Sequence, residues 1–174
     1  MQSLIQLSEQ LGERLLQQGE VLATAESCTG GGVANMVTEV AGSSAWFDRA
    51  FVTYSNEAKQ EMLGVAEKTL ADFGAVSEAV VKEMVLGTLA HSNATIAVSI
   101  SGIAGPSGGS AEKPVGTVCF GFADKYGWLR CETCYFAGDR AKVRIQAIEY
   151  SLKVLCDALL KNGSERKQQA KFFI

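Results

Sequence analysis

The stretch TIAVSIS, residues 95–101, decides the fold. It is a nearly continuous run of apolar and β-branched residues, a pattern typical of a central strand that is covered on both faces. A long glycine-rich segment, GIAGPSGGSAEKPVG, follows it at residues 102–116. A strand buried on both sides needs helices above and below it, so this stretch predicts an α/β domain.

The rest of the chain supplies the helices and strands that such a domain needs. Leucines at helical spacing predict a helix over residues 3–18, and an apolar helical pattern steps through Ala141, Ile145, Ile148 and Leu152 in a last helix over residues 139–160. Shorter helices are expected at 30–40, 57–63, 67–73 and from Ser77 onward, and further strands at 21–25, 50–54, 117–123 and 129–136. We therefore predict a single three-layer α/β/α domain with a mixed sheet of about five strands over residues 1–160, followed by a polar tail over residues 161–174.

Bulk composition narrows the class of protein. The chain has 174 residues and a net charge of −3 with acids and bases mixed along it, which argues against a nucleic-acid surface. No stretch approaches the ~20 apolar residues that span a bilayer. Its five cysteines are odd in number and irregularly spaced, so we expect reduced thiols and a cytoplasmic location. Cys131 and Cys134 form a lone CxxC pair without partners for zinc, and we expect no metal.

Four polar or glycine-rich junctions each follow a predicted strand. They cover residues 26–32, 54–59, 101–116 and 138–144. Ligands of open α/β sheets gather outside the carboxyl ends of the strands, so we expect these junctions to meet at one site.

The first junction lies in ATAESCTGGGVA, residues 23–34. Glycines at a helix N-terminus can hold a phosphate or an oxyanion, or can simply allow a tight turn. Ser27 lies directly before this turn, where acyl transfer would need a nucleophile. Cys28 is a rival nucleophile, although a small buried thiol is the simpler interpretation.

A serine nucleophile needs a base. The only histidine, His91, lies at a predicted helix end, so a serine–histidine triad has weak support. Lys59 follows the strand end at Tyr54 and can turn back toward the same site, where shielding from water would ease the loss of its proton. The alternative is that Lys59 is an ordinary solvated surface lysine.

The start of the last helix carries an excess of cations. Arg140, Lys142 and Arg144 lie where the helix dipole disfavours positive charge, unless an anion binds there. Arg140 and Arg144 share a helix face and could clamp a phosphate together. The alternative is a solvated cluster with Asp139 as the N-cap.

Several motifs, taken in order, resemble the CinA C-terminal family, the nicotinamide-nucleotide amidases. They are AESCTGG, GSSAWF, FVTYSNEAK, GAVSE, SISGIAGPSGGSAEKPVGTV and FAGDR, and the resemblance covers residues 5–160. It implies a stand-alone enzyme that hydrolyses the carboxamide of nicotinamide mononucleotide to nicotinic acid mononucleotide and ammonia in NAD recycling, with no metal or cofactor. It also implies Ser27 as the nucleophile, Lys59 as the base and Tyr54 as an assisting hydroxyl.

The remaining site residues are our assignments on this basis. The amides of Thr29, Gly30 and Gly31 are expected to form the oxyanion hole. The groups expected to hold the mononucleotide are Asn56, Ser101, Gly102, Gly105, Pro106 and Arg140.

Two other functions stay open from the sequence. A non-catalytic nucleotide-binding module could use the same glycine loops and arginines, and a thiol amidase could use Cys28. The apolar end of the tail, Phe172-Phe173-Ile174, and the long last helix favour a homodimer. The family resemblance implies a small molecule as the substrate.

Overall fold

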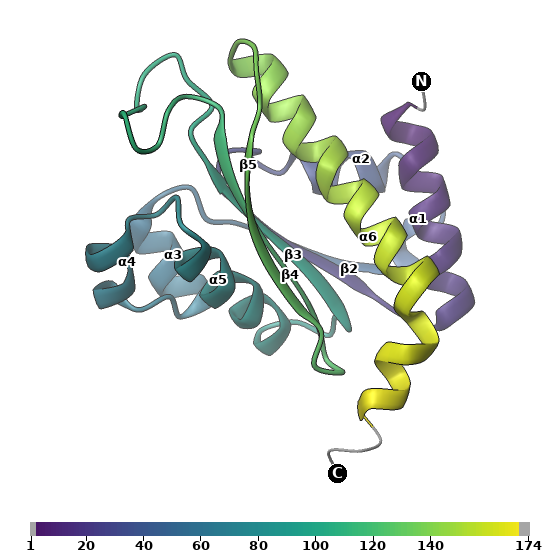
Figure 1. Cartoon of the computed structure of the whole chain (residues 1–174). Coiled ribbons are helices and arrows are strands. Elements are labelled where there is room, and N and C mark those ends of the chain that lie inside the picture. The colour runs from purple at the N-terminus through teal and green to yellow at the C-terminus, as the bar shows by residue number, and fades with distance from the viewer. Residues whose placement is uncertain (1–2, 171–174) are drawn as a thin grey trace.

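The computed structural model describes residues 3–170. Helices and strands alternate along the chain, in an order that ends with two strands and a long helix (Figure 1). The elements are α1 (Leu4–Gln18), β1 (Leu22–Glu26), α2 (Gly32–Thr38), the 3-10 helix η1 (Ser43–Ala45), β2 (Phe47–Val52), α3 (Asn56–Leu63), α4 (Glu67–Phe73), α5 (Glu78–Ala90), β3 (Ile96–Gly102), β4 (Thr117–Asp124), β5 (Leu129–Tyr135) and α6 (Arg140–Ala170).

The five strands form one open mixed sheet in the order β2-β1-β3-β4-β5. Strand β1 pairs in parallel with both β2 and β3, whereas β4 runs antiparallel to β3 and to β5. The predicted strand at TIAVSIS is β3, and it lies at the centre of the sheet. Both the predicted fold class and the mixed sheet are confirmed.

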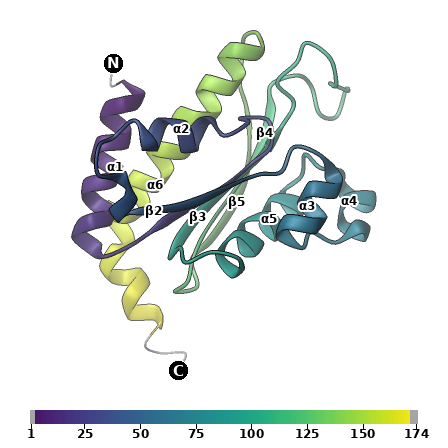
Figure 2. The ribbon, with the colours of Figure 1, turned by 180° about the vertical axis from the view of Figure 1, so that it is seen from behind.

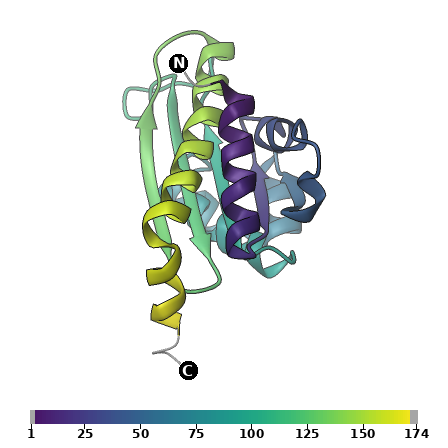
Figure 3. The ribbon, with the colours of Figure 1, turned by 90° about the vertical axis from the view of Figure 1, so that its right-hand side faces the viewer.

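The sheet lies between two helical layers. Helices α1, α2 and α6 cover one face and α3, α4 and α5 cover the other (Figures 1 and 2). Seen from the side, α1 and α6 lie next to each other along the sheet (Figure 3). Two side-chain hydrogen bonds join them: Arg14 donates to the carbonyl of Cys156 at 2.7 Å, and Gln18 donates to the carbonyl of Leu159 at 2.6 Å.

The two faces of the sheet differ in the size of their side chains. On the α1 and α6 side, β3 and β4 present large residues such as Ile100 and Phe120, which belong to the main hydrophobic core. On the α5 side they present small ones: the hydroxyl of Ser99 donates to the carbonyl of Val81 at 2.6 Å, and a Cβ on Gly121 would lie 2.6 Å from the same oxygen. Small residues therefore allow the backbone of α5 to approach the sheet closely.

Two predicted elements have the wrong bounds. Strand β2 spans residues 47–52 rather than 50–54, because its ladder to β1 begins at Phe47 and ends at Val52. Helix α6 continues to Ala170 rather than ending at Leu160. Residues 161–170 are rich in good helix formers, and one glycine among them does not stop the helix. The separation of a tail over residues 161–174 stays a prediction, and residues 171–174 lie outside the described part of the chain.

Within residues 3–170, none of the helices is both long and apolar enough to cross a membrane.

Gly87 in α5 provides a test of the contact between α5 and α3. A Cβ on Gly87 would lie 2.0 Å from the carbonyl oxygen of Leu63, the last residue of α3. In an unhindered helix, Gly87→Ala would stabilise the protein by up to about 1 kcal/mol. Here we expect it to lower the free energy of unfolding by about 1–3 kcal/mol, the usual cost of overpacking. Urea unfolding measures this difference, and a variant as stable as the wild type would contradict the contact.

Candidate active site

The predicted junctions meet at one cavity of about 200 Å³ outside the carboxyl ends of β1 and β3. Seven predicted site residues line it: Ser27, Tyr54, Asn56, Lys59, Ser101, Gly102 and Arg140. Four further residues line the cavity: Ala75, Val76 and Ala104, for which we predicted no role, and Cys28, the rival nucleophile. The predicted residues Thr29, Gly30, Gly31, Gly105 and Pro106 do not line the cavity.

The amine of Lys59 lies beside the hydroxyl of Ser27. Lys59 is only 1 % exposed, and its Nζ is 3.1 Å from Ser27 Oγ. The other partners of this amine are two backbone carbonyls: it donates to Thr53 at 2.8 Å and to Tyr54 at 3.2 Å. The alternative of a solvated surface lysine is therefore wrong.

Burial lowers the pKa of Lys59 below that of an ordinary lysine, because a charged amine loses its hydration there. A thiolate at Cys28 would raise the pKa of Lys59, but this effect is weaker than that of burial. Among the side chains of residues 3–160, which are those that the structure describes, no carboxylate forms an ion pair with this amine. A neutral amine next to a serine hydroxyl can accept its proton, which is the requirement for a general base.

The local sequence explains how α3 places Lys59 next to Ser27. Strand β2 ends at Val52, which leaves the carbonyls of residues 53 and 54 free of the sheet. Ser55 then caps α3 by accepting a hydrogen bond from the amide of Ala58 at 3.0 Å. Lys59 falls one turn later on the buried face of the helix, and Gly64 ends the helix in the left-handed region with φ 74°.

Glu26 is a buried acid whose importance the sequence reasoning missed. It is 0 % exposed, and its carboxylate accepts hydrogen bonds from the amides of Val33 and Ala34 at 2.8 and 3.1 Å. The hydroxyls of Thr24 and Thr29 also donate to it, at 3.0 and 2.8 Å. The carboxylate thus occupies the N-terminus of α2 and fixes the turn that carries Ser27. One sequence feature could have identified Glu26: it is an acid at the end of an apolar strand, a few residues before the start of a helix.

The glycines after Ser27 shape the turn. Gly30 and Gly31 have φ values of 57° and 92°, which favour glycine. The Gly30 amide, expected to face an oxyanion, donates instead to the carbonyl of Ser27 at 3.0 Å. In the part of the chain that the structure describes, the amide of the cavity residue Cys28 has no acceptor in another residue. This backbone N–H lies directly after the serine.

The Cys28 thiol is a poor nucleophile in this setting. Burial raises its pKa to about 11, so the thiol is neutral near pH 7. Its sulfur lies close to the end of β3, 3.1 Å from where a Cβ on Gly102 would be.

Only one of the two arginines at the start of α6 lines the cavity. Arg140 donates to the carbonyl of Gly105 at 2.9 Å and to the hydroxyl of Tyr54 at 3.3 Å. Arg144 donates to the carbonyls of Cys28 and Thr29, at 3.0 and 3.3 Å. Arg144 thus contacts the turn after Ser27 and is not among the residues that line the cavity. A clamp of both arginines on one phosphate stays a prediction.

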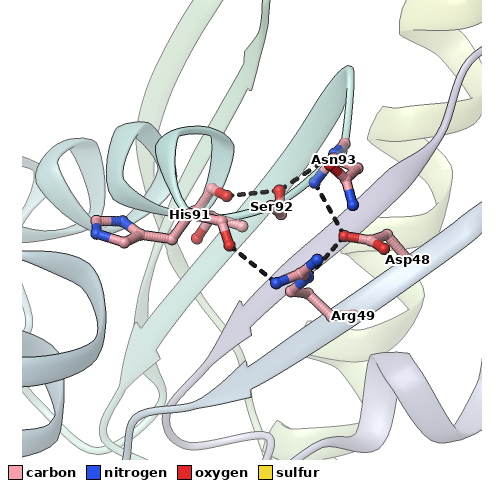
Figure 4. Close-up of polar contacts among 7 residues, drawn as sticks. Asp48, Arg49, His91, Ser92 and Asn93 are labelled. Atoms are coloured by element: carbon pink, nitrogen blue, oxygen red, sulfur yellow. Dashed lines mark hydrogen bonds and ion pairs between the residues drawn. The ribbon is translucent and has the colours of Figure 1, made fainter.

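His91 lies at the far end of β3 from Ser27, and its position confirms the expected helix-end role. It is the C-cap residue of α5, and its ring Nδ1 is 2.8 Å from the carbonyl of Gly87. Figure 4 shows it in a polar group with Asp48, Arg49, Ser92 and Asn93. Arg49 joins this group by donating to Asp48 at 2.7 Å and to the carbonyl of His91 at 3.2 Å.

Cys131 and Cys134 lie on opposite faces of β5. Cys131 is paired with Gly121 on the α5 side, and Cys134 with Val118 on the α6 side. Among the described side chains, those of residues 3–160, there is no group of three or more His, Cys, Asp or Glu that could hold a metal ion.

The role of Glu26 can be tested with an isosteric amide. Glu26→Gln replaces one acceptor oxygen by an NH2 group that cannot accept from the α2 amides. We expect the free energy of unfolding to fall by about 2–4 kcal/mol, because hydrogen bonds to charged groups are worth ~1.5–3 kcal/mol each. The matched control is Glu39→Gln, an exposed acid at the other end of α2, which should change it by less than about 0.5 kcal/mol. Equal urea midpoints for the two variants would contradict this role.

Comparisons with known proteins agree on one family. Residues 4–159 match the family model described as the CinA C-terminal domain. The chain is 58% identical over 159 residues to the nicotinamide-nucleotide amidohydrolase PncC of Escherichia coli K12, covering 91% of this chain and 96% of that one. It is 47% identical over 165 residues to the protein of the same name from Pseudomonas putida, covering 95% and 100%. The crystal structure of the competence/damage inducible protein CihA from Agrobacterium tumefaciens superposes with a TM-score of 0.87 at 43% identity, covering 91% and 96%.

Proposed function

The chain belongs to the CinA C-terminal domain family, and from this premise we propose that it is a nicotinamide-nucleotide amidase. It would hydrolyse the carboxamide of nicotinamide mononucleotide to nicotinic acid mononucleotide and ammonia, a step in pyridine nucleotide recycling. The names of its relatives support the substrate. The observation that carries the chemistry is the buried amine of Lys59 at 3.1 Å from Ser27 Oγ.

The first step is nucleophilic attack by Ser27 on the amide carbon. The neutral Lys59 amine has two N–H groups and one lone pair. Its two N–H groups donate to the carbonyls of Thr53 and Tyr54, which directs the lone pair toward Ser27. Lys59 takes the Ser27 proton as the oxygen attacks, and a tetrahedral oxyanion forms.

The oxyanion and the leaving group need separate partners. We assign the Cys28 amide to the oxyanion, because it belongs to the cavity and follows the nucleophile. The protonated Lys59 then donates to the amide nitrogen, and ammonia leaves. Water hydrolyses the acyl-enzyme by the same route, with Lys59 again as base. Asn56 and Ser101 line the same cavity and can orient the carboxamide.

The phosphate of the nucleotide must bind away from the turn after Ser27. The N-terminus of α2 is already occupied by the Glu26 carboxylate, which would repel a second anion. Arg140 is the one arginine that lines the cavity within the described chain, and its guanidinium can turn from Gly105 and Tyr54 to a phosphate.

The two rival functions are less well supported. A non-catalytic nucleotide-binding module has no use for a buried lysine, whose burial is costly. A thiol amidase would need a reactive thiolate, whereas burial raises the pKa of Cys28 to about 11. We retain a homodimer and a cytoplasmic location, without nucleic-acid or membrane partners, as parts of this proposal.

Loss of the nucleophile gives the direct test. Ser27→Ala should reduce ammonia release from nicotinamide mononucleotide by roughly 10³-fold or more. Calorimetry should still detect mononucleotide binding, since the other cavity residues remain. The control is Cys28→Ala, which keeps the backbone amide and should retain most of the activity. Near-normal turnover by Ser27→Ala, or loss of activity only in Cys28→Ala, would overturn the assignment.

The lowered pKa of Lys59 predicts two pH effects. As pH rises through that pKa, Lys59 becomes neutral, so kcat/KM should rise. The native pKa lies below the unfolded value, so between the two the unfolded state binds more protons. The native state is therefore less stable at low pH, and its free energy of unfolding rises as the pH increases from the native to the unfolded pKa of Lys59.

Lys59→Met removes both effects. This variant should be inactive, and its stability should lack the rise that the wild type shows toward the ordinary lysine pKa. Lys68→Met is the matched control, because Lys68 is an exposed lysine that pairs with Asp72 on α4. Urea unfolding at a series of pH values, together with the pH profile of kcat/KM, checks the prediction. Parallel stability profiles for wild type and Lys59→Met would contradict a native pKa below the usual value.

A further inference from the structure

Two segments give the cavity an apolar lining. Gly102 and Ala104 belong to the end of β3 and the residues after it, whereas Ala75 and Val76 come from the short connection between α4 and α5. The side chains of this connection are small, and they pack partly on the core cluster between the sheet and α5. They form a wall without catalytic groups of its own, which we call the 75–76 wall.

Lys113 reaches this connection from the glycine-rich segment between β3 and β4. Its Nζ donates to the carbonyl of Phe73, the last residue of α4, at 2.8 Å. A Cβ on Gly74 would lie 3.5 Å from the same Nζ, so the ammonium also lies against the backbone of Gly74. The last carbonyls of a helix lack partners within the helix and carry partial negative charge, and both features favour a lysine there.

The backbone of Lys113 is itself fixed by a tight turn. Its carbonyl accepts from the amide of Ser110 at 2.9 Å, and its amide donates to the Ser110 hydroxyl at 3.0 Å. On the α6 side, Arg140 donates to the carbonyl of Gly105 in the same segment. The glycine-rich segment, seen as the long loop at the upper left of Figure 1, is thus tied to both flanks of the cavity.

We propose that Lys113 is a positioning residue: it holds the 75–76 wall in place and so sets the space in the cavity that receives a flat aromatic carboxamide. This inference rests on the proposed amidase function and deepens it. A planar ring has apolar faces and polar edge groups, which suits a cavity lined both by small apolar residues and by Ser27 and Lys59. If the wall moves, ring binding weakens, while the serine–lysine pair is unchanged.

A direct contact between Lys113 and the phosphate is the competing role. Both roles predict weaker substrate binding when the charge is removed. Only the positioning role predicts a change in the free protein, where the Gly74 amide donates to the carbonyl of Leu70 at 2.9 Å next to the lysine contact. Amide exchange at Gly74 in the absence of substrate therefore separates the two roles.

The experiment compares Lys113→Met and Lys113→Arg with Lys68→Met, a control lysine on α4 itself. In Lys113→Met we expect exchange at the Gly74 amide, followed by NMR, to become about tenfold faster. We expect KM for nicotinamide mononucleotide to rise about fivefold to tenfold, with kcat within about twofold of the wild type. Lys113→Arg should restore both values, and Lys68→Met should alter neither.

The outcomes are distinguishable. A raised KM with unchanged Gly74 exchange would mean direct contact with substrate and would overturn the positioning role. Unchanged KM and exchange in an active enzyme would overturn it as well. If the wild type released no ammonia, the proposed function would fail. In that case, faster exchange at the Gly74 amide in Lys113→Met would still support the conclusion that Lys113 holds the 75–76 wall in place.

Discussion

The structure depends on one buried amine that has only neutral partners. Lys59 Nζ lies within hydrogen-bond distance of the Ser27 hydroxyl and of the Thr53 and Tyr54 carbonyls. Burying a lysine is costly, and these three partners offset the cost only if each is in place. Strand β2 must end at Val52 so that the two carbonyls leave the sheet, and α3 must sit against Gly87 of α5.

The site keeps its buried acid apart from its buried amine. Glu26 and Lys59 both lie within a few residues of the strand ends, yet they form no ion pair with each other in the described chain. Glu26 takes its hydrogen bonds from two helix amides and two threonine hydroxyls. A carboxylate beside Lys59 would stabilise the ammonium and raise its pKa, which would defeat a base. Glu26 can therefore organise the nucleophile turn without holding the lysine in its charged form.

The correct predictions from the sequence rest on hydrophobic periodicity and on the expectation that loops at the strand ends meet at one site. The central strand, the long helices and the cavity residues Ser27, Tyr54, Lys59, Ser101 and Arg140 follow from local patterns, from the rule that loops at strand ends share a site, and from the family resemblance. What the sequence did not indicate depends on contacts between distant segments. The bounds of β2 follow from its pairing with β1, and the carbonyls that Arg144 contacts belong to residues 28 and 29. Neither contact leaves a local periodic signal.

The cations around the cavity show how a glycine-rich site can be made rigid. Arg144 and Arg140 donate to backbone carbonyls of connecting segments, namely those of Cys28 and Thr29 and of Gly105, and Lys113 donates to the carbonyl of Phe73 at the end of α4. Such segments leave carbonyls outside the regular ladders, and a buried carbonyl without a partner is unfavourable. A cation on a neighbouring element satisfies the carbonyl and fixes the segment in one step. The glycines after Ser27 can then serve turn geometry alone, and Arg144 at the start of α6 has a role that does not require it to bind the substrate.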